Sequence, residues 1–151
     1  MAGDTILHTA KQPFKPGQAV RLKNFRMSTM NIDRPMVYGI PNCDTVKKSR
    51  DWLTARAVSH GFHDFKKQGL PVAEVDRWMA TLGYEKLLNR RGPSWRKLGE
   101  VIQATVIDAA SAKAVMQANA SVIKRPVIVW PGGKITVGFD ETAWLTLLET
   151  P

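Results

Sequence analysis

The chain has 151 residues, of which 44% are hydrophobic and 23% are charged, and this is the composition of a single globular domain. Its net charge of +9 predicts a basic surface that can attract acidic proteins or anionic small molecules. The chain has no basic block with interleaved aromatic residues, so nucleic-acid binding is not indicated. Neither a transmembrane helix nor a secretory signal is expected. The single cysteine excludes an internal disulfide and a CxxC redox pair. We therefore expect a cytoplasmic protein that has neither a membrane nor a nucleic acid as its partner.

Residues 1–35 differ from the rest of the chain. They show no sustained hydrophobic period, prolines and glycines interrupt them, and they carry six Lys/Arg against two Asp/Glu. We expect a poorly ordered extension here, with a short strand at 19–22. The folded domain is expected to span residues 36–151.

A strand, a helix and a second strand are predicted at the start of this domain. The apolar run "MVYGI" at 36–40 indicates a buried strand, and residues 43–57 place Val46 and Leu53 on one helical face, with Asn42 as the N-cap. The segment "HGFHDF" at 60–65 indicates the second strand. Such a unit pairs its two strands in parallel.

The middle of the domain is predicted to be helical and to form an inserted lobe at about 70–120. Pro71 is expected at a first helical position, Gly83 at a C-terminal cap and Asp108 at an N-cap. A turn is expected in "RRGPSW". The predicted helices lie in the segments "GLPVAEVDRWMATLGY", "YEKLLN", "WRKLGEVIQATVI" and "DAASAKAVMQAN".

The last part predicts a β-hairpin followed by a helix. "RPVIVW" and "ITVGF" are β-rich runs around the tight turn "PGGK", and Asp140 is the expected N-cap of "DETAWLTLLET". The whole order is β-α-β, a helical block, then β-β-α. With a cysteine at the start of the first helix, this is the order of an α/β thioredoxin-like fold with a mixed sheet.

Cys43 is the principal candidate for chemistry. A free thiol has a pKa of about 8.5, and a helix N-terminus lowers it because unpaired amides point at the sulfur. Lys47 and Lys48 add positive potential, so that a thiolate here could attack a disulfide or an oxyanion. The alternative is a buried structural cysteine. His8, His60 and His63 form no cluster with the cysteine, so no metal site is expected.

Five ordered segments carry a resemblance to a known family. They are "YGIPNCDTVKKSRDWL", "FHDF", "LLNRRGPSWRKL", "DAASAKAVM" and "IKRPVIV". Together they resemble the arsenate reductase-like (ArsC/Spx) family, in particular its YffB-type branch of thiol reductases, from about residue 36 to 149. The resemblance implies a thioredoxin-like domain with an inserted helical lobe and no bound cofactor.

The resemblance also implies roles for individual residues. Cys43 is the nucleophile, Arg125 faces it, and the Arg125–Pro126 peptide bond is expected to be cis. A helical-lobe arginine reaches over the site; Arg91 is favoured for this role and Arg90 is its competitor. The residues expected to bind substrate or glutathione are Asn42, Thr45, Lys47, Arg90 and Pro126.

The function that the resemblance implies is thiol-dependent reduction, with glutathione or glutaredoxin as the external thiol donor and a small oxyanion or disulfide as substrate. Arsenate itself is not the expected substrate, because arsenate reductases carry a third arginine just after the last strand, where this chain has Gly138 and Phe139. The alternative is an Spx-like transcriptional regulator that binds RNA polymerase. Such proteins commonly carry CxxC, whereas Val46 stands three residues after Cys43. A redox-inactive interaction domain is a third alternative.

Overall fold

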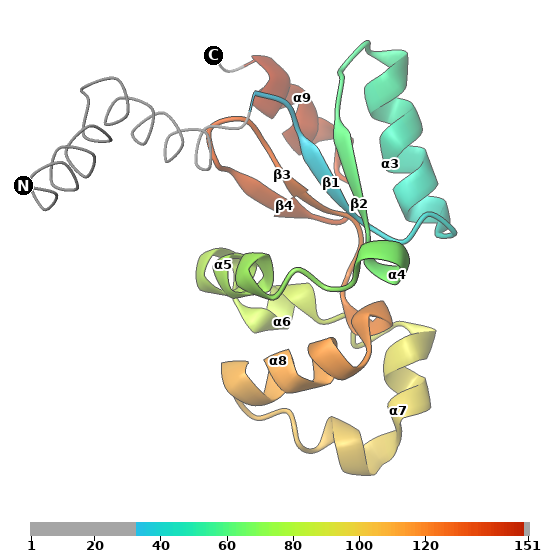
Figure 1. Ribbon diagram of the computed structural model, residues 1–151, viewed down its shortest axis with the longest axis vertical. Coiled ribbons are helices and arrows are strands. Elements are labelled where there is room, and N and C mark those ends of the chain that lie inside the picture. Colours follow the sequence, from blue (N-terminus) through green and yellow to red (C-terminus); the bar gives the residue numbers. More distant parts are fainter. Residues whose placement is uncertain (1–32, 150–151) are drawn as a thin grey trace, which may run out of the picture.

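The computed structural model describes residues 33–149, so the expectations for the preceding segment, including the strand at 19–22, lie outside the described residues. A sheet with two helices forms the upper part of the molecule in Figure 1, and further helices form a lobe below it. In chain order the elements are β1 (Met36–Gly39), α3 (Asp44–Ala55), β2 (Gly61–Asp64), α4 (Phe65–Gln68), α5 (Val72–Leu82), α6 (Tyr84–Leu87), α7 (Pro93–Gln103), α8 (Ala109–Ala118), the 3₁₀ turn η2 (Ala120–Val122), β3 (Val127–Val129), β4 (Ile135–Val137) and α9 (Glu141–Glu149).

Within residues 33–149 the sheet has four strands, in the order β2-β1-β3-β4. β1 and β2 are parallel and are joined through α3, as the βαβ pattern predicts. β3 is antiparallel to both β1 and β4, and β3 and β4 form the predicted hairpin. The sheet is therefore mixed, and β1 lies between its parallel and antiparallel halves.

The alternation of side chains along the strands builds two hydrophobic clusters, one on each face of the sheet. Val37 and Ile128 point to the face covered by α3 and α9, where they join Trp52, Trp130 and Trp144. Residues next to them in sequence point the opposite way, toward the helical lobe, where the larger cluster includes Tyr38, Val127, Val129, Ile135, Trp78 and Met116. Both faces of the sheet are thus covered, and the two central strands, β1 and β3, consist of almost continuous apolar residues.

The helical lobe lies between β2 and β3 in the sequence. Gly83 ends α5 with φ of 87°, and Asp108 begins α8 with a capping box in which Ser111 is the reciprocal partner. α7 is interrupted at Gly99, whose φ of 82° is not helical. An antiparallel bridge between Leu88 and Ile123 connects the lobe to the chain that leads into β3.

Several predicted boundaries are wrong. α7 begins at Pro93, inside the predicted turn "RRGPSW", and ends at Gln103, four residues before the end of the predicted segment "WRKLGEVIQATVI". Other boundaries differ by one or two residues. Cys43, and not Asn42, is the N-cap of α3, because Asn42 belongs to the preceding turn. The helix ends at Ala55, since Ala57 has a positive φ of 58° that breaks the helical path. The second strand stops at Asp64, whose side chain accepts hydrogen bonds from two amides of α4 and so begins a helix at Phe65. Pro71 is the N-cap of α5 and lies just before its first helical position.

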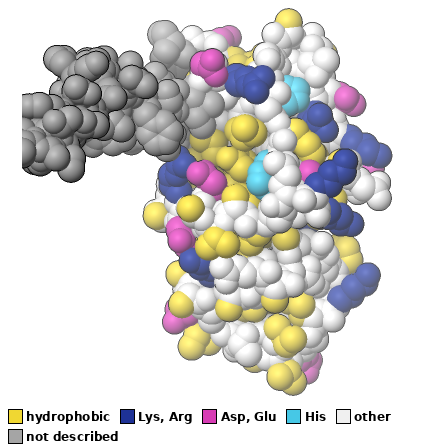
Figure 2. Space-filling model, in the orientation of Figure 1, with side chains coloured by type: hydrophobic (Ala, Val, Ile, Leu, Met, Phe, Trp, Pro, Cys, Tyr) yellow, Lys and Arg dark blue, Asp and Glu magenta, His cyan; other side chains and the backbone are white. Residues whose placement is uncertain are grey.

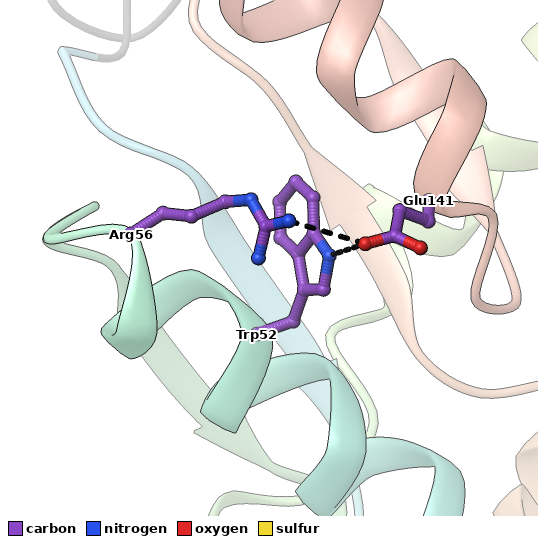
Figure 3. A network of polar contacts seen from close by, with 3 residues as sticks. All are labelled: Trp52, Arg56 and Glu141. Carbon is purple, nitrogen blue, oxygen red and sulfur yellow. Dashed lines mark hydrogen bonds and ion pairs between the residues drawn. The ribbon is translucent and has the colours of Figure 1, made fainter.

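A polar network joins α3 to α9 (Figure 3). The indole Nε1 of Trp52 donates to Oε2 of Glu141 at 2.7 Å, and the Arg56 guanidinium reaches the same oxygen at 3.1 Å. The guanidinium carbon of Arg56 also lies 3.9 Å from the centre of a Trp52 ring. Because the Arg56–Glu141 pair is solvent-exposed, the indole hydrogen bond contributes more to the attachment of the two helices than the ion pair does.

The surface is basic on the side of α3. Figure 2 shows Lys and Arg side chains gathered on that side of the molecule, whereas apolar side chains reach the surface over the lower lobe. Among the described residues, the most exposed large hydrophobic side chains are those of Val101 and Ile107. Within residues 33–149 no helix is both long and apolar enough to cross a membrane.

Candidate active site

Cys43 lies at the junction between β1 and α3, as its position in the sequence predicts. Its backbone is extended, with φ of −135° and ψ of 125°, and its carbonyl accepts the first helical hydrogen bond from the Lys47 amide at 2.9 Å. The side chain is half-buried and not disulfide-bonded. Cys43 is the N-cap residue of α3, and its side chain makes no capping hydrogen bond. The sulfur therefore occupies the place where a helix usually holds a capping oxygen.

Gly39 lets the first turn of α3 approach β1 closely. A Cβ at Gly39 would lie 2.9 Å from Cγ2 of Val46 and 3.9 Å from Cβ of Arg125. Val46 is fully buried and its branched side chain has little rotameric freedom, so it cannot easily give way. Gly39 is not among the site residues predicted from the sequence. A glycine at the end of an apolar strand can indicate close approach of another segment, and this pattern could have identified it.

The surroundings of Cys43 favour the thiolate. Burial raises the pKa of the Cys43 thiol, but the Val46 amide, the hydrogen bond and charge of the Arg125 guanidinium, and the Thr45 amide together hold it below its ordinary value. Two of these three contributors belong to the first turn of α3, where amides have no intrahelical partner. The third contributor, Arg125, lies in the chain just before β3. The site is therefore electrostatically prepared for a negatively charged sulfur.

Arg125 is held by the chain that precedes it. Its Nη1 donates to the carbonyl oxygens of Ser121 at 2.7 Å and Ile123 at 3.4 Å. Its Nε is buried and has no hydrogen-bond partner in the described part of the chain. These carbonyls hold Nη1 of the guanidinium, and they leave the buried Nε unused. No sequence pattern indicates the two anchoring carbonyls, because their positions depend on the three-dimensional path of the chain from η2 to β3.

The peptide bond between Arg125 and Pro126 is cis, which confirms that prediction. Pro126 is buried at the entrance to β3. Its carbonyl accepts a hydrogen bond from Gly138 at 2.8 Å, so it also belongs to the end of the hairpin. β1, β3 and β4 thus bring Cys43, Arg125 and the residues after β4 to the same end of the sheet.

Arg90 and Arg91 lie in the turn before α7 and have different surroundings. The guanidinium carbon of Arg90 is 5.3 Å from a ring centre of Trp95. The backbone carbonyl of Arg91 accepts from Arg96, but the exposed Arg91 side chain has no partner within residues 33–149. The backbone N–H of Asn89, just before this turn, donates to the Val122 carbonyl at 2.8 Å. The turn is therefore tied to the stretch whose carbonyls hold Arg125.

The remaining predicted site residues lie around the start of α3. Asn42, Thr45 and Lys47 are exposed there, and the Thr45 carbonyl accepts a hydrogen bond from Ser49 at 2.7 Å. Lys47 also lines a surface depression that runs along the outer side of α3, but Cys43 does not line it. No group of three His, Cys, Asp or Glu side chains within the described residues could hold a metal ion.

Phe139, the second residue after β4, makes aromatic contacts at the position where a third arginine would lie. The ring of Phe139 packs edge-on against Trp144 with centres 4.8 Å apart, and the Lys48 ammonium lies 4.7 Å from the Phe139 ring centre. A cation from α3 is therefore present near this position, although it is held over an aromatic face. A third arginine is absent from 138 and 139, as the sequence shows.

Comparison with known proteins identifies the family of this site. A model of the ArsC family matches residues 38–147. An uncharacterized protein of Haemophilus influenzae is 38% identical over 105 residues, which are 70% of this chain and 90% of that protein.

Two solved structures are similar in both sequence and fold. The YFFB protein is 42% identical with a TM-score of 0.70, over 76% of this chain and 98% of its own. An arsenate reductase (ArsC) related protein from Brucella melitensis is 41% identical with a TM-score of 0.61, over 79% and 98%. These similarities confirm the predicted α/β thioredoxin-like fold with its mixed four-stranded sheet. The chain belongs to the ArsC family.

Proposed function

We propose that this protein is a thiol-dependent reductase in which the Cys43 thiolate is the nucleophile and glutathione, or glutaredoxin, is the external thiol. Membership of the ArsC family supports an oxidoreductase of the thiol reductase type. The observation that carries the proposal is the position of Cys43 at the start of α3, where first-turn amides and Arg125 lower its pKa. A thiolate is the reactive form of cysteine in disulfide exchange.

The proposed reaction has two balanced steps for a glutathione mixed disulfide. The Cys43 thiolate attacks the glutathione sulfur, an S–S bond forms between them, and the substrate sulfur leaves as a thiolate that takes up a proton. A second glutathione, as its thiolate, then attacks the Cys43–glutathione disulfide. Oxidised glutathione leaves and the Cys43 thiolate is regenerated. The second thiol must be external because the chain has one cysteine.

Arg125 and Arg91 are the cationic groups of the proposed mechanism. The unused buried Nε of Arg125 can donate to an anionic group beside the sulfur, while its charge stabilises the thiolate before attack and after regeneration. Arg91 has the freer side chain of the two lobe arginines, because Arg90 lies over Trp95. We therefore assign to Arg91 the contact with a substrate carboxylate or oxyanion.

The substrate proposed is a glutathione-sized molecule and not arsenate. A compact oxyanion loses its hydration on binding and needs several charged donors in return. Arg125 and Arg91 supply two, and Lys48 is engaged by the ring of Phe139. Glutathione distributes its two carboxylates over a wider surface, and we assign the contacts with it to Asn42, Thr45 and Lys47, which are exposed and close to Cys43 in the sequence.

The test measures turnover of a glutathionylated peptide with reduced glutathione, using the full chain. Cys43→Ser should lower the rate by about 10³-fold or more, because no other thiol can attack. Arg125→Ala should lower it by about 10²-fold, as expected for loss of preorganised charge at the reacting group. Arg91→Ala should raise KM more than Arg90→Ala does.

Circular dichroism and amide spectra of each variant serve as the control for folding. Turnover in Cys43→Ser equal to that of the parent protein would refute the mechanism. Arsenate-dependent thiol oxidation is measured in parallel, and a rate faster than that with the glutathionylated peptide would refute the substrate assignment. A parent protein that is inactive with both substrates would favour the regulator or interaction-domain alternatives.

A further inference from the structure

β4 is an edge strand whose outer side carries backbone groups available for pairing. It pairs with β3 on one side, and no strand of residues 33–149 pairs with its other side. Hydrogen bonds join Trp130 to Lys134 at 2.7 Å and Pro126 to Gly138 at 2.8 Å. Hydrogen-bonded and non-bonded pairs alternate in an antiparallel ladder. Ile135 and Val137, which lie in the non-bonded pairs, therefore direct their N–H and C=O groups outward.

A groove runs along this outer edge and is rimmed by lysines. It has a volume of about 640 Å³ and is lined by Leu82, Thr81 and Lys86 from the helical lobe, by Lys124, and by residues 134–137 of the hairpin. Lys134 comes directly before β4, and Lys124 lies beside Gly138, directly after β4. All three lysines are exposed, and none has an acidic partner in the described part of the chain.

The groove thus combines three features that suit one type of ligand. Ile135 and Val137 offer two outward donors and two outward acceptors in the register of a strand. Leu82 and Val137 supply partly buried apolar surface beside them. The lysines bracket the edge at both ends and add a third cation from α6. Backbone pairing along a sheet edge provides affinity, and charges around it provide specificity.

We propose that the outer edge of β4 is a docking site for an extended acidic segment of a partner protein, which adds to the sheet as a fifth strand. The acidic character follows from Lys86, Lys124 and Lys134. A second copy of this chain does not fit, because pairing β4 with β4 would bring the same lysines together and the chain has a net charge of +9. Residues 1–32 do not fit either, since they carry five Lys/Arg and one Asp.

The experiment uses the ¹⁵N-labelled full chain and the capped peptide acetyl-Glu-Val-Glu-Thr-Glu-Val-Glu-amide. We expect the largest amide shift changes at Ile135 and Val137, together with at least tenfold slower hydrogen exchange of these two amides when the peptide is bound. Binding should weaken severalfold when NaCl is raised from about 0.05 to 0.3 M. The double variant Lys86→Glu/Lys134→Glu should bind the peptide at least tenfold more weakly. Lys124 is left unchanged because it adjoins Arg125.

Three controls make the outcome decisive. Lys67→Glu/Lys97→Glu changes the net charge equally on other exposed surfaces and should retain the parent affinity. A peptide with Gln for Glu should bind at least tenfold more weakly, and one with Pro for both Val residues should not bind, since proline cannot donate to a ladder. Shift changes centred elsewhere, equal binding of the Gln peptide, or equal losses in the two double variants would overturn the proposal. Slow exchange of the Ile135 and Val137 amides in a peptide-free dimer would overturn it in favour of self-pairing.

Discussion

At the scale of single residues, burial and nearby polar groups have opposite effects on the pKa of Cys43. Burial of the Cys43 sulfur disfavours the thiolate, whereas Val46 and Thr45 amides and the Arg125 guanidinium favour it. The second group prevails, so the pKa of Cys43 lies below its ordinary value. Arg125 contributes both a hydrogen bond and a charge, so it is the side chain whose replacement tests the balance most directly.

We predict that the alkylation rate of Cys43 by iodoacetamide rises with pH to a midpoint below that of an ordinary thiol, about 8.5. Arg125→Ala should raise this midpoint, because it removes the hydrogen bond and the charge while burial remains. The sign for stability follows from the same shift. A lowered pKa in the folded state makes the thiolate stabilise the fold above the unfolded-state pKa, and this contribution is lost as pH falls through the folded-state pKa.

Arg91→Ala is the matched control for this prediction, because Arg91 is not among the groups that shift the Cys43 pKa. Its midpoint should equal that of the parent protein. An unchanged midpoint in Arg125→Ala would show that the helix amides alone stabilise the thiolate.

At the scale of elements, the close packing of α3 on β1 depends on a glycine in the strand, which has no side chain at the point of contact. Gly39 faces Val46, and the separation leaves no room for a Cβ. Val46 in turn presents one of the amides that lowers the Cys43 pKa. The distance between strand and helix therefore sets the electrostatics of the sulfur as well as the packing.

We predict that Gly39→Ala lowers the free energy of unfolding by about 1–3 kcal/mol, the usual cost of overpacking a core. It should also raise the midpoint of Cys43 alkylation, because α3 has to move away from the site. Urea denaturation and the alkylation profile measure the two effects. In the double variant Gly39→Ala/Val46→Ala the steric conflict is absent, so the loss should be about 1 kcal/mol smaller than the sum of the single losses. Additive losses would contradict the proposed contact.

At the scale of the whole molecule, the sheet couples the helical lobe to α3 and α9. Neighbouring residues of one strand, such as Val127 and Ile128, belong to the two different hydrophobic clusters. The bridge between Leu88 and Ile123 adds a direct link from the lobe to the chain entering β3. Loss of either cluster exposes one face of the same strands. The helical lobe and the α3/α9 layer should therefore unfold together.

We predict a single cooperative unfolding transition for residues 36–149. The five tryptophans provide the reporters, since Trp78 and Trp95 lie in the lobe-side cluster and Trp52, Trp130 and Trp144 lie in the other. The native indole N–H signals of all five should decrease with one urea midpoint. An earlier loss of the Trp78 and Trp95 signals would show that the lobe unfolds first and would contradict the prediction.

Local patterns predicted most of the elements because their causes are local. Asp108 and Asp140 accept amide hydrogen bonds at the helix starts where they were expected, and "PGGK" joins the two antiparallel strands. Prediction was wrong where a tertiary contact or a competing local bond decided the boundary. Asp64 caps a helix, so the strand does not continue beyond it. Asn42 belongs to the turn before α3, and the N-cap is therefore the next residue, Cys43.

The sequence by itself determined the element order, the helix-start position of Cys43 and the family resemblance, because hydrophobic period, capping residues and segment order are properties of neighbouring residues. Only the tertiary structure decided which groups meet the sulfur. Arg125 is 82 positions away along the chain, and carbonyls of Ser121 and Ile123 aim it; Gly39 matters only because Val46 packs onto it. The position of β4 at the edge of the sheet, among the described residues, likewise depends on the strand order. Such contacts arise from chain folding over long sequence separations, which no local period or cap encodes.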